Sequence, residues 1–259
     1  MTQAAERLCT GFTIVELAVA LFLLALVFGG VFVPLNAQVE SRKIAETGQV
    51  LDKATEALLG YAATRGYFPC PADATSSGQE AAGSDHATGE CPAYHGFLPA
   101  AALGLPGTDA SGYALDGWAT PANRIRYAVA RQGPGGANNT FTRVNGMRAA
   151  GISSLTNAAL SLLHVCGSAK GVSAGVNCGS AATLVSAAPV VIWSVGANAA
   201  AGGASLDEAQ NPNPNGGSTD RIFVARVPSN VPGSEFDDIV KWVAVPILIG
   251  RMVAAGQLP

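Results

Sequence analysis

Length, composition and charge exclude several classes of protein. Only 13% of the 259 residues are charged and 49% are hydrophobic, which excludes a disordered polyelectrolyte and favours one globular domain with one membrane segment. The net charge is −3 and no cluster of lysines or arginines provides a positive footprint, so we expect no nucleic-acid partner.

A long apolar run follows a short polar start. Residues 17–33 carry no charged or strongly polar group, and extension back to Phe12 gives about 22 residues, or about 33 Å of helix. This length spans a bilayer core and exceeds the apolar region of a cleaved secretory signal. We therefore predict a membrane-spanning helix at residues 12–34.

Glu16 places one carboxylate near the start of this run. An ionised carboxylate in hydrocarbon costs at least a few kcal/mol, so the side chain needs a cation or a proton. A simpler interpretation is that the helix begins at Leu17, which leaves Glu16 at the headgroup level as an acid favoured by the helix dipole.

The segment GFTIVEL at residues 11–17 resembles the processing motif of type IV pilins and of the pseudopilins of type II secretion. The usual form of that motif is G-F-T-L-x-E-L ahead of a long apolar helix. The resemblance implies cleavage between Gly11 and Phe12 by a prepilin peptidase on the cytoplasmic face, followed by N-methylation of Phe12. The leader departs from the family pattern, because its single Arg7 is offset by Glu6.

Cleavage would give Glu16 a partner, because the new α-amino group of Phe12 is a cation at neutral pH. The carboxylate can meet the amine of a neighbouring subunit or the amine of its own helix. A pair between subunits fixes register, since a shifted subunit leaves two uncompensated charges at a cost of about 3–5 kcal/mol.

A second helical pattern follows Pro34, which lacks an amide donor and should kink the helix there. Largely apolar residues recur after it at spacings of three to five and would form a stripe along one face of a helix, with the charged residues largely on the other faces. This pattern predicts an amphipathic stem helix at residues 35–66. The stripe comprises Leu35, Val39, Ile44, Thr47, Leu51, Ala54, Leu58 and Ala62.

Four of the five cysteines follow the apolar run, and Cys9 precedes it. None forms C-x-x-C and the three histidines show no metal spacing, so disulfides in an oxidising compartment are favoured over zinc. Four cysteines allow three connectivities, of which we favour the sequential one. It pairs Cys70 with Cys91 and Cys166 with Cys178.

The rest of the chain, residues 67–259, is predicted to form a globular head. Alternating or continuous apolar residues predict strands at 125–129, 190–195 and 222–227. Ser154 is expected to cap a short helix that carries Leu155, Leu160, Leu163 and Val165. The segment FDDIVKWV at 236–243 is expected to begin a C-terminal helix, limited by Pro246.

These elements predict an α+β, pilin-like fold. Its long N-terminal helix would have a membrane-spanning half and an amphipathic half, packed on a small antiparallel sheet with disulfide-pinned loops.

Two further candidate sites lie in the head. Residues 171–175, GVSAG, match the G-x-S-x-G nucleophile pattern, but a glycine-rich loop between two cysteines lacks the strand and helix that a nucleophile elbow needs. We therefore expect no enzyme activity and no catalytic residue. Asp207, Glu208 and Asp220 bracket a loop comparable to one that binds calcium in some pseudopilins, with Asp207 and Asp220 as the candidate ligands, although their spacing is not that of an EF-hand. No other cofactor or metal is expected.

The resemblance implies a structural subunit of a type IV pilus or of a type II secretion pseudopilus. The head of roughly 190 residues favours a minor subunit. Expected partners are other pilin or pseudopilin subunits, the prepilin peptidase and the inner-membrane assembly machinery. The chain would cross the bacterial inner membrane once, with residues 1–11 as a cytoplasmic leader and the head in the periplasm, before it joins the filament. The alternative is a signal-anchored periplasmic enzyme or binding module that uses the helix only as a tether.

Overall fold

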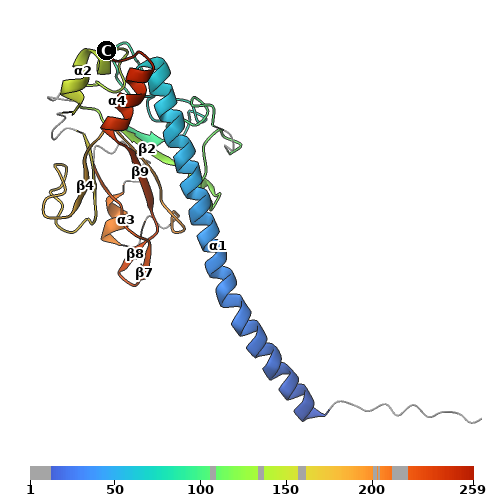
Figure 1. Cartoon of the computed structure of the whole chain (residues 1–259). Helices are drawn as coiled ribbons and strands as arrows, with labels where there is room; N and C mark the ends of the chain where they lie inside the picture. Colours follow the sequence, from blue (N-terminus) through green and yellow to red (C-terminus); the bar gives the residue numbers. More distant parts are fainter. Residues whose placement is uncertain are drawn as a thin grey trace, which may run out of the picture. The chain divides into compact units, whose positions relative to one another are not determined.

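The computed structural model divides the chain into two compact units, residues 1–42 and residues 43–259. It describes residues 13–105, 109–133, 137–156, 162–200, 203, 205–211 and 221–259, with the side chains of 26–37 left out (Figure 1). Helix α1, Ile14–Arg65, contributes to both units.

The first unit contains the beginning of α1, and here one prediction is wrong. No helix in the described part of the chain is both long and apolar enough to cross a membrane. The exposed, largely apolar stretch whose side chains are described is residues 14–25, and as a helix it is about 18 Å long. The hydrocarbon core of a bilayer is about 30 Å thick. This finding contradicts the predicted membrane-spanning helix at 12–34 and the predicted single-pass location in the inner membrane.

In the second unit the end of α1 is amphipathic, as the stem pattern predicts. Thr47, Leu51, Ala54, Leu58 and Ala62 are all 0% exposed, and their spacing of three or four residues keeps them on one face. The helix stops at Arg65, and Gly66 follows with φ +81°, a conformation that glycine adopts at little cost.

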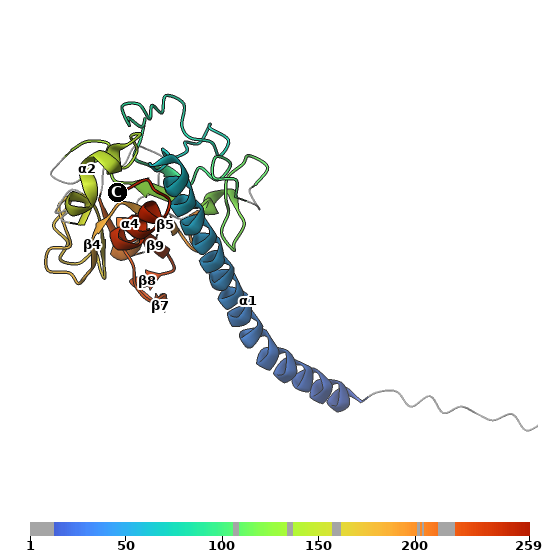
Figure 2. The same cartoon turned by 45° about the horizontal axis from the view of Figure 1, so that its top comes forward.

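The buried face of the stem joins the core of a four-stranded antiparallel sheet. The strand order is β1-β2-β5-β9, with β1 at His95–Phe97, β2 at Arg126–Val129, β5 at Val190–Ser194 and β9 at Ile239–Val243. Strands β5 and β9 run next to each other in register from Val190 opposite Val243 to Ser194 opposite Ile239 (Figure 2). Both central strands are buried throughout, whereas the sequence alternation had predicted a half-buried strand for β2.

Two further sheets lie in the described part of the head. The second has the order β4-β3-β6, from Thr183–Ala188, Leu163–Cys166 and Ile222–Val224, and its β3–β6 pair is parallel. The third is the hairpin of β7, Ser229–Val231, and β8, Ser234–Phe236. The protein is therefore α+β with disulfides, but the predicted pilin-like fold is wrong. Its strands form three sheets, one of them mixed, and no described helix meets the length and apolarity that a membrane-spanning half needs.

The remaining helices also differ from expectation. Helix α2 occupies Gly146–Thr156 and α3 occupies Leu206–Gln210, while Leu163 and Val165 lie on strand β3 instead of a helix. The segment expected to begin the C-terminal helix forms β9, and helix α4 starts only at Val245 and runs to Ala254. Pro246 occupies the first turn of α4, where its missing amide hydrogen is not needed.

Two disulfides link residues that are close in sequence. Cys70 bonds to Cys91 and Cys166 bonds to Cys178, each with a Cα–Cα distance of 5.5 Å. The sequential pairing is confirmed. Cys9 lies outside the described residues. Because such bonds persist in oxidising surroundings, they indicate an oxidising compartment.

Candidate functional site

The N-terminal motif is described from Thr13 onward, so Gly11 and Phe12 lie outside the described residues. The helix begins at Ile14, three residues before Leu17, and Glu16 lies in its first turn. The amide of Glu16 donates to Thr13 Oγ1 at 3.2 Å, and the amide of Thr13 donates to Glu16 Oε2 at 3.4 Å. This reciprocal pair is a capping box, so Glu16 has a local role at the helix start in addition to its charge.

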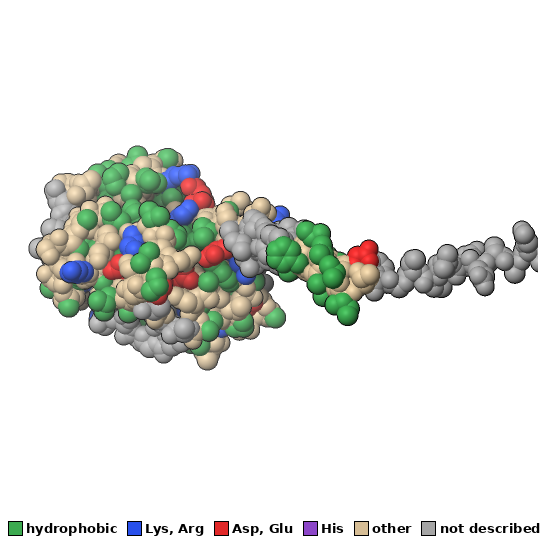
Figure 3. All heavy atoms as spheres, turned by 90° about the horizontal axis from the view of Figure 1, so that it is seen from below, with side chains coloured by type: hydrophobic (Ala, Val, Ile, Leu, Met, Phe, Trp, Pro, Cys, Tyr) green, Lys and Arg blue, Asp and Glu red, His purple; other side chains and the backbone are tan. Residues whose placement is uncertain are grey.

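The turns that follow expose an apolar surface. Ile14 is 88% exposed, Val15 72% and Phe22 65%, and hydrophobic side chains gather along this part of α1 (Figure 3). Within the described part of the chain, Glu16 forms no ion pair. An exposed apolar surface of this kind marks a site of association.

In the second unit three carboxylates come together near the start of α3. Glu208, Asp237 and Asp238 place ligand atoms within 4.8 Å of one another. Glu208 is positioned by Ser205, whose hydroxyl caps the helix by accepting from the Glu208 amide at 3.3 Å. The two aspartates precede β9, whose pairing with β5 brings them to this point.

The surroundings of the two aspartates favour their protonation. Burial, followed by the charge of Glu208, raises the pKa of Asp237 to about 6. Burial also raises the pKa of Asp238 to about 8, although a hydrogen bond from Asn211 Nδ2 at 2.7 Å partly opposes the shift. At neutral pH the cluster therefore retains a proton, or it would accept a cation in the proton's place.

Most oxygens of this cluster already accept hydrogen bonds. The amide of Asp237 donates to Glu208 Oε1 at 3.0 Å, and the side chain of Asn198 donates to Glu208 Oε2 at 3.0 Å. Asp237 Oδ2 accepts from the amides of Ala197 and Asn198, whereas Asp237 Oδ1 is buried without a partner among the described residues. Calcium usually takes six to eight oxygens, so the cluster offers only part of a calcium site.

Of the residues predicted for calcium, Glu208 belongs to this cluster and Asp207 does not. Asp207 pairs with Arg226 at 2.7 Å and accepts from the amide of Ala169 at 2.7 Å, and Asp220 lies outside the described residues. Sequence reasoning missed Asp237 and Asp238 because it assigned them to the first turn of a helix. The adjacent acids before an alternating IVKWV segment were the available signal.

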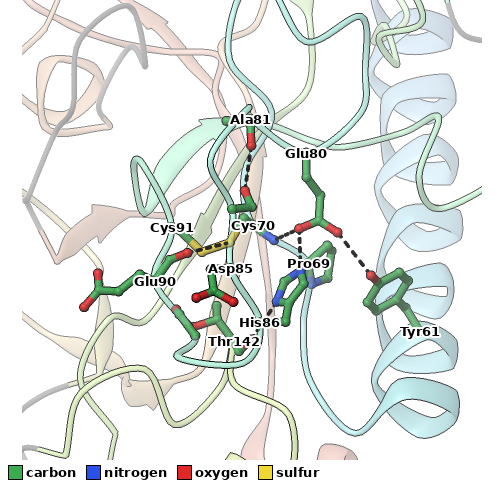
Figure 4. A network of polar contacts seen from close by, with 12 residues as sticks. Tyr61, Pro69, Cys70, Glu80, Ala81, Asp85, His86, Glu90, Cys91 and Thr142 are labelled. Atoms are coloured by element: carbon green, nitrogen blue, oxygen red, sulfur yellow. Dashed lines mark hydrogen bonds and ion pairs between the residues drawn. A yellow bond between two sulfur atoms is a disulfide. The ribbon is translucent and has the colours of Figure 1, made fainter.

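A second polar network links α1 to the first disulfide loop (Figure 4). Glu80 accepts from Tyr61 Oη at 3.1 Å, from the amide of Cys70 at 2.9 Å and from His86 Nε2 at 2.7 Å. The other ring nitrogen of His86 lies 2.7 Å from the carbonyl oxygen of Thr142. A carboxylate and a carbonyl only accept, so this geometry is satisfied on both sides when His86 carries both ring protons.

The pKa shifts of this pair agree with a charged interaction. Burial lowers the pKa of His86, but the hydrogen bonds to Glu80 and to Thr142 outweigh it, so the pKa is raised. Burial would raise the pKa of Glu80, but the hydrogen bonds from His86 and from the Cys70 amide leave it lowered. Cys70 Sγ also lies near both residues, but its bond to Cys91 removes it as a thiolate ligand for a metal.

The G-x-S-x-G segment at 171–175 lies in the connection between β3 and β4. Ser173 is exposed and forms a short antiparallel bridge with Asn177 inside the second disulfide loop. The predicted loop context is confirmed, and the strand-turn-helix arrangement of a nucleophile elbow is not formed at these residues.

Searches of protein-family models, curated proteins and solved structures find no match for this chain.

Proposed function

We propose that this chain is a structural subunit of a filament of the type IV pilus or type II secretion pseudopilus class. A prepilin peptidase would cleave between Gly11 and Phe12, and the subunit would assemble through the start of α1. The head differs from the predicted pilin-like fold, so the proposal rests on the N-terminal motif alone.

The observation that carries the proposal is the position of Glu16. The carboxylate lies in the exposed first turn of a helix, four residues after Phe12, without an ion pair to any described residue. The α-amino group that cleavage creates on Phe12 is a cation at neutral pH. A neighbouring subunit would bring this amine to the carboxylate, and packed helices would cover the apolar side chains of residues 14–24.

Mass spectrometry of the N-terminus tests the processing step. The full chain is produced with and without a prepilin peptidase, and its N-terminal peptide is identified in each case. We expect a peptide that begins with methylated Phe12 only when the peptidase is present. An intact leader in the presence of an active peptidase would reject the proposal and favour the alternative of a tethered enzyme or binding module.

Two substitutions separate the charge of Glu16 from its capping role. Glu16→Gln removes the charge but keeps a residue type that completes a capping box, whereas Glu16→Leu removes both. We expect both variants to be lost from filaments. Glu46→Leu, which removes an exposed acid further along the same helix, serves as the matched control and should assemble normally. Normal assembly of Glu16→Gln would show that the carboxylate acts only as a cap.

A further inference from the structure

A cavity of about 370 Å³ opens in the second unit, at the ends of strands from two different sheets. The first sheet contributes the start of β1 and the end of β2, and the second sheet contributes Leu163 of β3 and Arg221, which precedes β6. This volume is in the range of small-molecule sites. The walls are partly apolar, from Pro92, Val129 and Leu163.

His95 lies in the wall of this cavity with an unsatisfied ring. It is 4% exposed, and its ring stacks on Phe223 with 5.7 Å between ring centroids. The imidazole makes no hydrogen bond to a described residue, and its Nδ1 is fully buried. Because Nδ1 is shielded, Nε2 is the ring nitrogen that a ligand atom in the cavity can contact. Burial lowers the pKa of His95 to about 4, so the ring is neutral at pH 7.

Two neighbouring side chains in the lining also have unused hydrogen-bonding groups. Arg131 stacks over the ring of Tyr94, 5.3 Å from its centroid, and forms no ion pair or side-chain hydrogen bond with a described residue. The side-chain amide of Gln132 likewise makes no hydrogen bond to a described residue. The stacking holds the planar guanidinium in place while its donors stay available.

Glu90, the acid among the described lining residues, is already engaged. Glu90 accepts from Asn139 Nδ2 at 3.0 Å and from Tyr94 Oη at 3.2 Å. Arg221 also lines the cavity and donates to the carbonyl of Gly175. The described groups still available, the Arg131 guanidinium and the Gln132 side-chain amide, offer hydrogen-bond donors and one fixed positive charge, which favours an anion over a cation.

We propose that this cavity binds a small organic carboxylate, held by the guanidinium of Arg131 together with His95 and Gln132. The forked donors of arginine match the two oxygens of a carboxylate, and the apolar walls would accept an apolar substituent. The ligand is a free acid or the C-terminal carboxylate of a short peptide, which present the same group. This inference is independent of the proposed filament function.

Binding is tested on the purified full-length chain with benzoate, benzamide and N-acetylphenylalanine, followed by calorimetry and by ¹⁵N NMR of the histidine rings. We expect saturable binding of at least one of the two carboxylates, a shift of the His95 ring signals, and no comparable binding of benzamide. Benzoate alone would indicate a free acid, and tighter binding of N-acetylphenylalanine would indicate a peptide C-terminus. Saturation by neither carboxylate, or equal binding of benzamide, would overturn the proposal.

Variants locate the site. Arg131→Ala should weaken carboxylate binding by about tenfold or more, because the charge-assisted pair is lost. Arg148→Ala on the exposed face of α2 makes the same change of charge outside the cavity and should leave binding unchanged. His95→Phe keeps an aromatic ring against Phe223 but removes both nitrogens, so it should weaken binding while the melting temperature is retained. Equal binding by all three variants would overturn the assignment.

Discussion

His86 donates through Nε2 to the carboxylate of Glu80 at 2.7 Å, and this contact joins the first disulfide loop to the end of α1 through Tyr61. Both side chains are largely buried, with 18% of each side chain exposed. Neither residue was singled out in the sequence, because six positions separate them in a loop without regular periodicity. The contact makes the stability of the head sensitive to pH.

The Glu80–His86 pair should stabilise the head most between about pH 4.5 and pH 6.5. The raised pKa of His86 gives stability that is present below its unfolded pKa and lost as pH rises through the folded value. The lowered pKa of Glu80 gives stability that is lost as pH falls through its folded value. Melting temperatures of wild type and His86→Gln, measured from pH 5 to pH 9, should differ most at the acidic end. A constant difference across this range would contradict a charged pair.

Removal of the buried charge at Asp238 should stabilise the protein at alkaline pH. The folded pKa is raised to about 8, so the folded state binds the extra proton and loses stability as pH rises from about 4 to about 8. Asp238→Asn keeps the shape and a possible hydrogen bond with Asn211. We expect a gain of roughly 1–3 kcal/mol at pH 8, with little gain at pH 4, by denaturant unfolding.

Asp207→Asn provides the matched control, because this acid is paired with Arg226 at 2.7 Å. The same chemical change should destabilise the protein at pH 8 instead of stabilising it. A gain in stability from both asparagine variants would contradict the assigned difference between the two acids.

Calcium should raise the melting temperature of the wild type if the three carboxylates accept the ion, and this shift should disappear in Asp238→Asn.

Each disulfide should contribute about 3 kcal/mol to the free energy of unfolding, because it restricts the unfolded chain. The Cys70–Cys91 bond closes a separation of 21 residues and the Cys166–Cys178 bond closes 12. Paired substitution by alanine, followed by urea unfolding, should therefore cost about half a kcal/mol more for the longer loop. A much larger cost for the shorter loop would indicate that folded-state contacts of the sulfurs dominate.

Gly196→Ala should be strongly destabilising. Gly196 has φ +65°, and an added Cβ would lie 2.3 Å from the side chain of Asp237. Both the backbone strain and the clash act in the folded state, and together they should cost about 2–4 kcal/mol. Gly233→Ala is the control, because its φ of +77° carries the same strain but no atom lies within 4 Å of the added Cβ. The difference in melting temperature between the two variants measures the contact with Asp237.

The sequence by itself determined the features whose cause is local. The stripe through Leu51, Leu58 and Ala62 follows from helical spacing, and strand β5 follows from a continuous apolar run. The disulfides join cysteines that are neighbours in the sequence, because short loops close at the lowest entropic cost. The G-F-T-x-x-E-L motif is equally local, and it still carries the proposed function.

Only the tertiary structure decided how the strands pair and what those pairs bring together. The segment at 239–243 was predicted to be helical, but it pairs with β5 and becomes an edge strand of the main sheet. That pairing places Asp237 and Asp238 beside Glu208, which lies 29 residues before the nearer of them. His95 and Arg131 likewise meet in one cavity because β1 pairs with β2 and two sheets pack together. Contacts of this kind depend on long-range pairing, which the periodicity of a single segment does not encode.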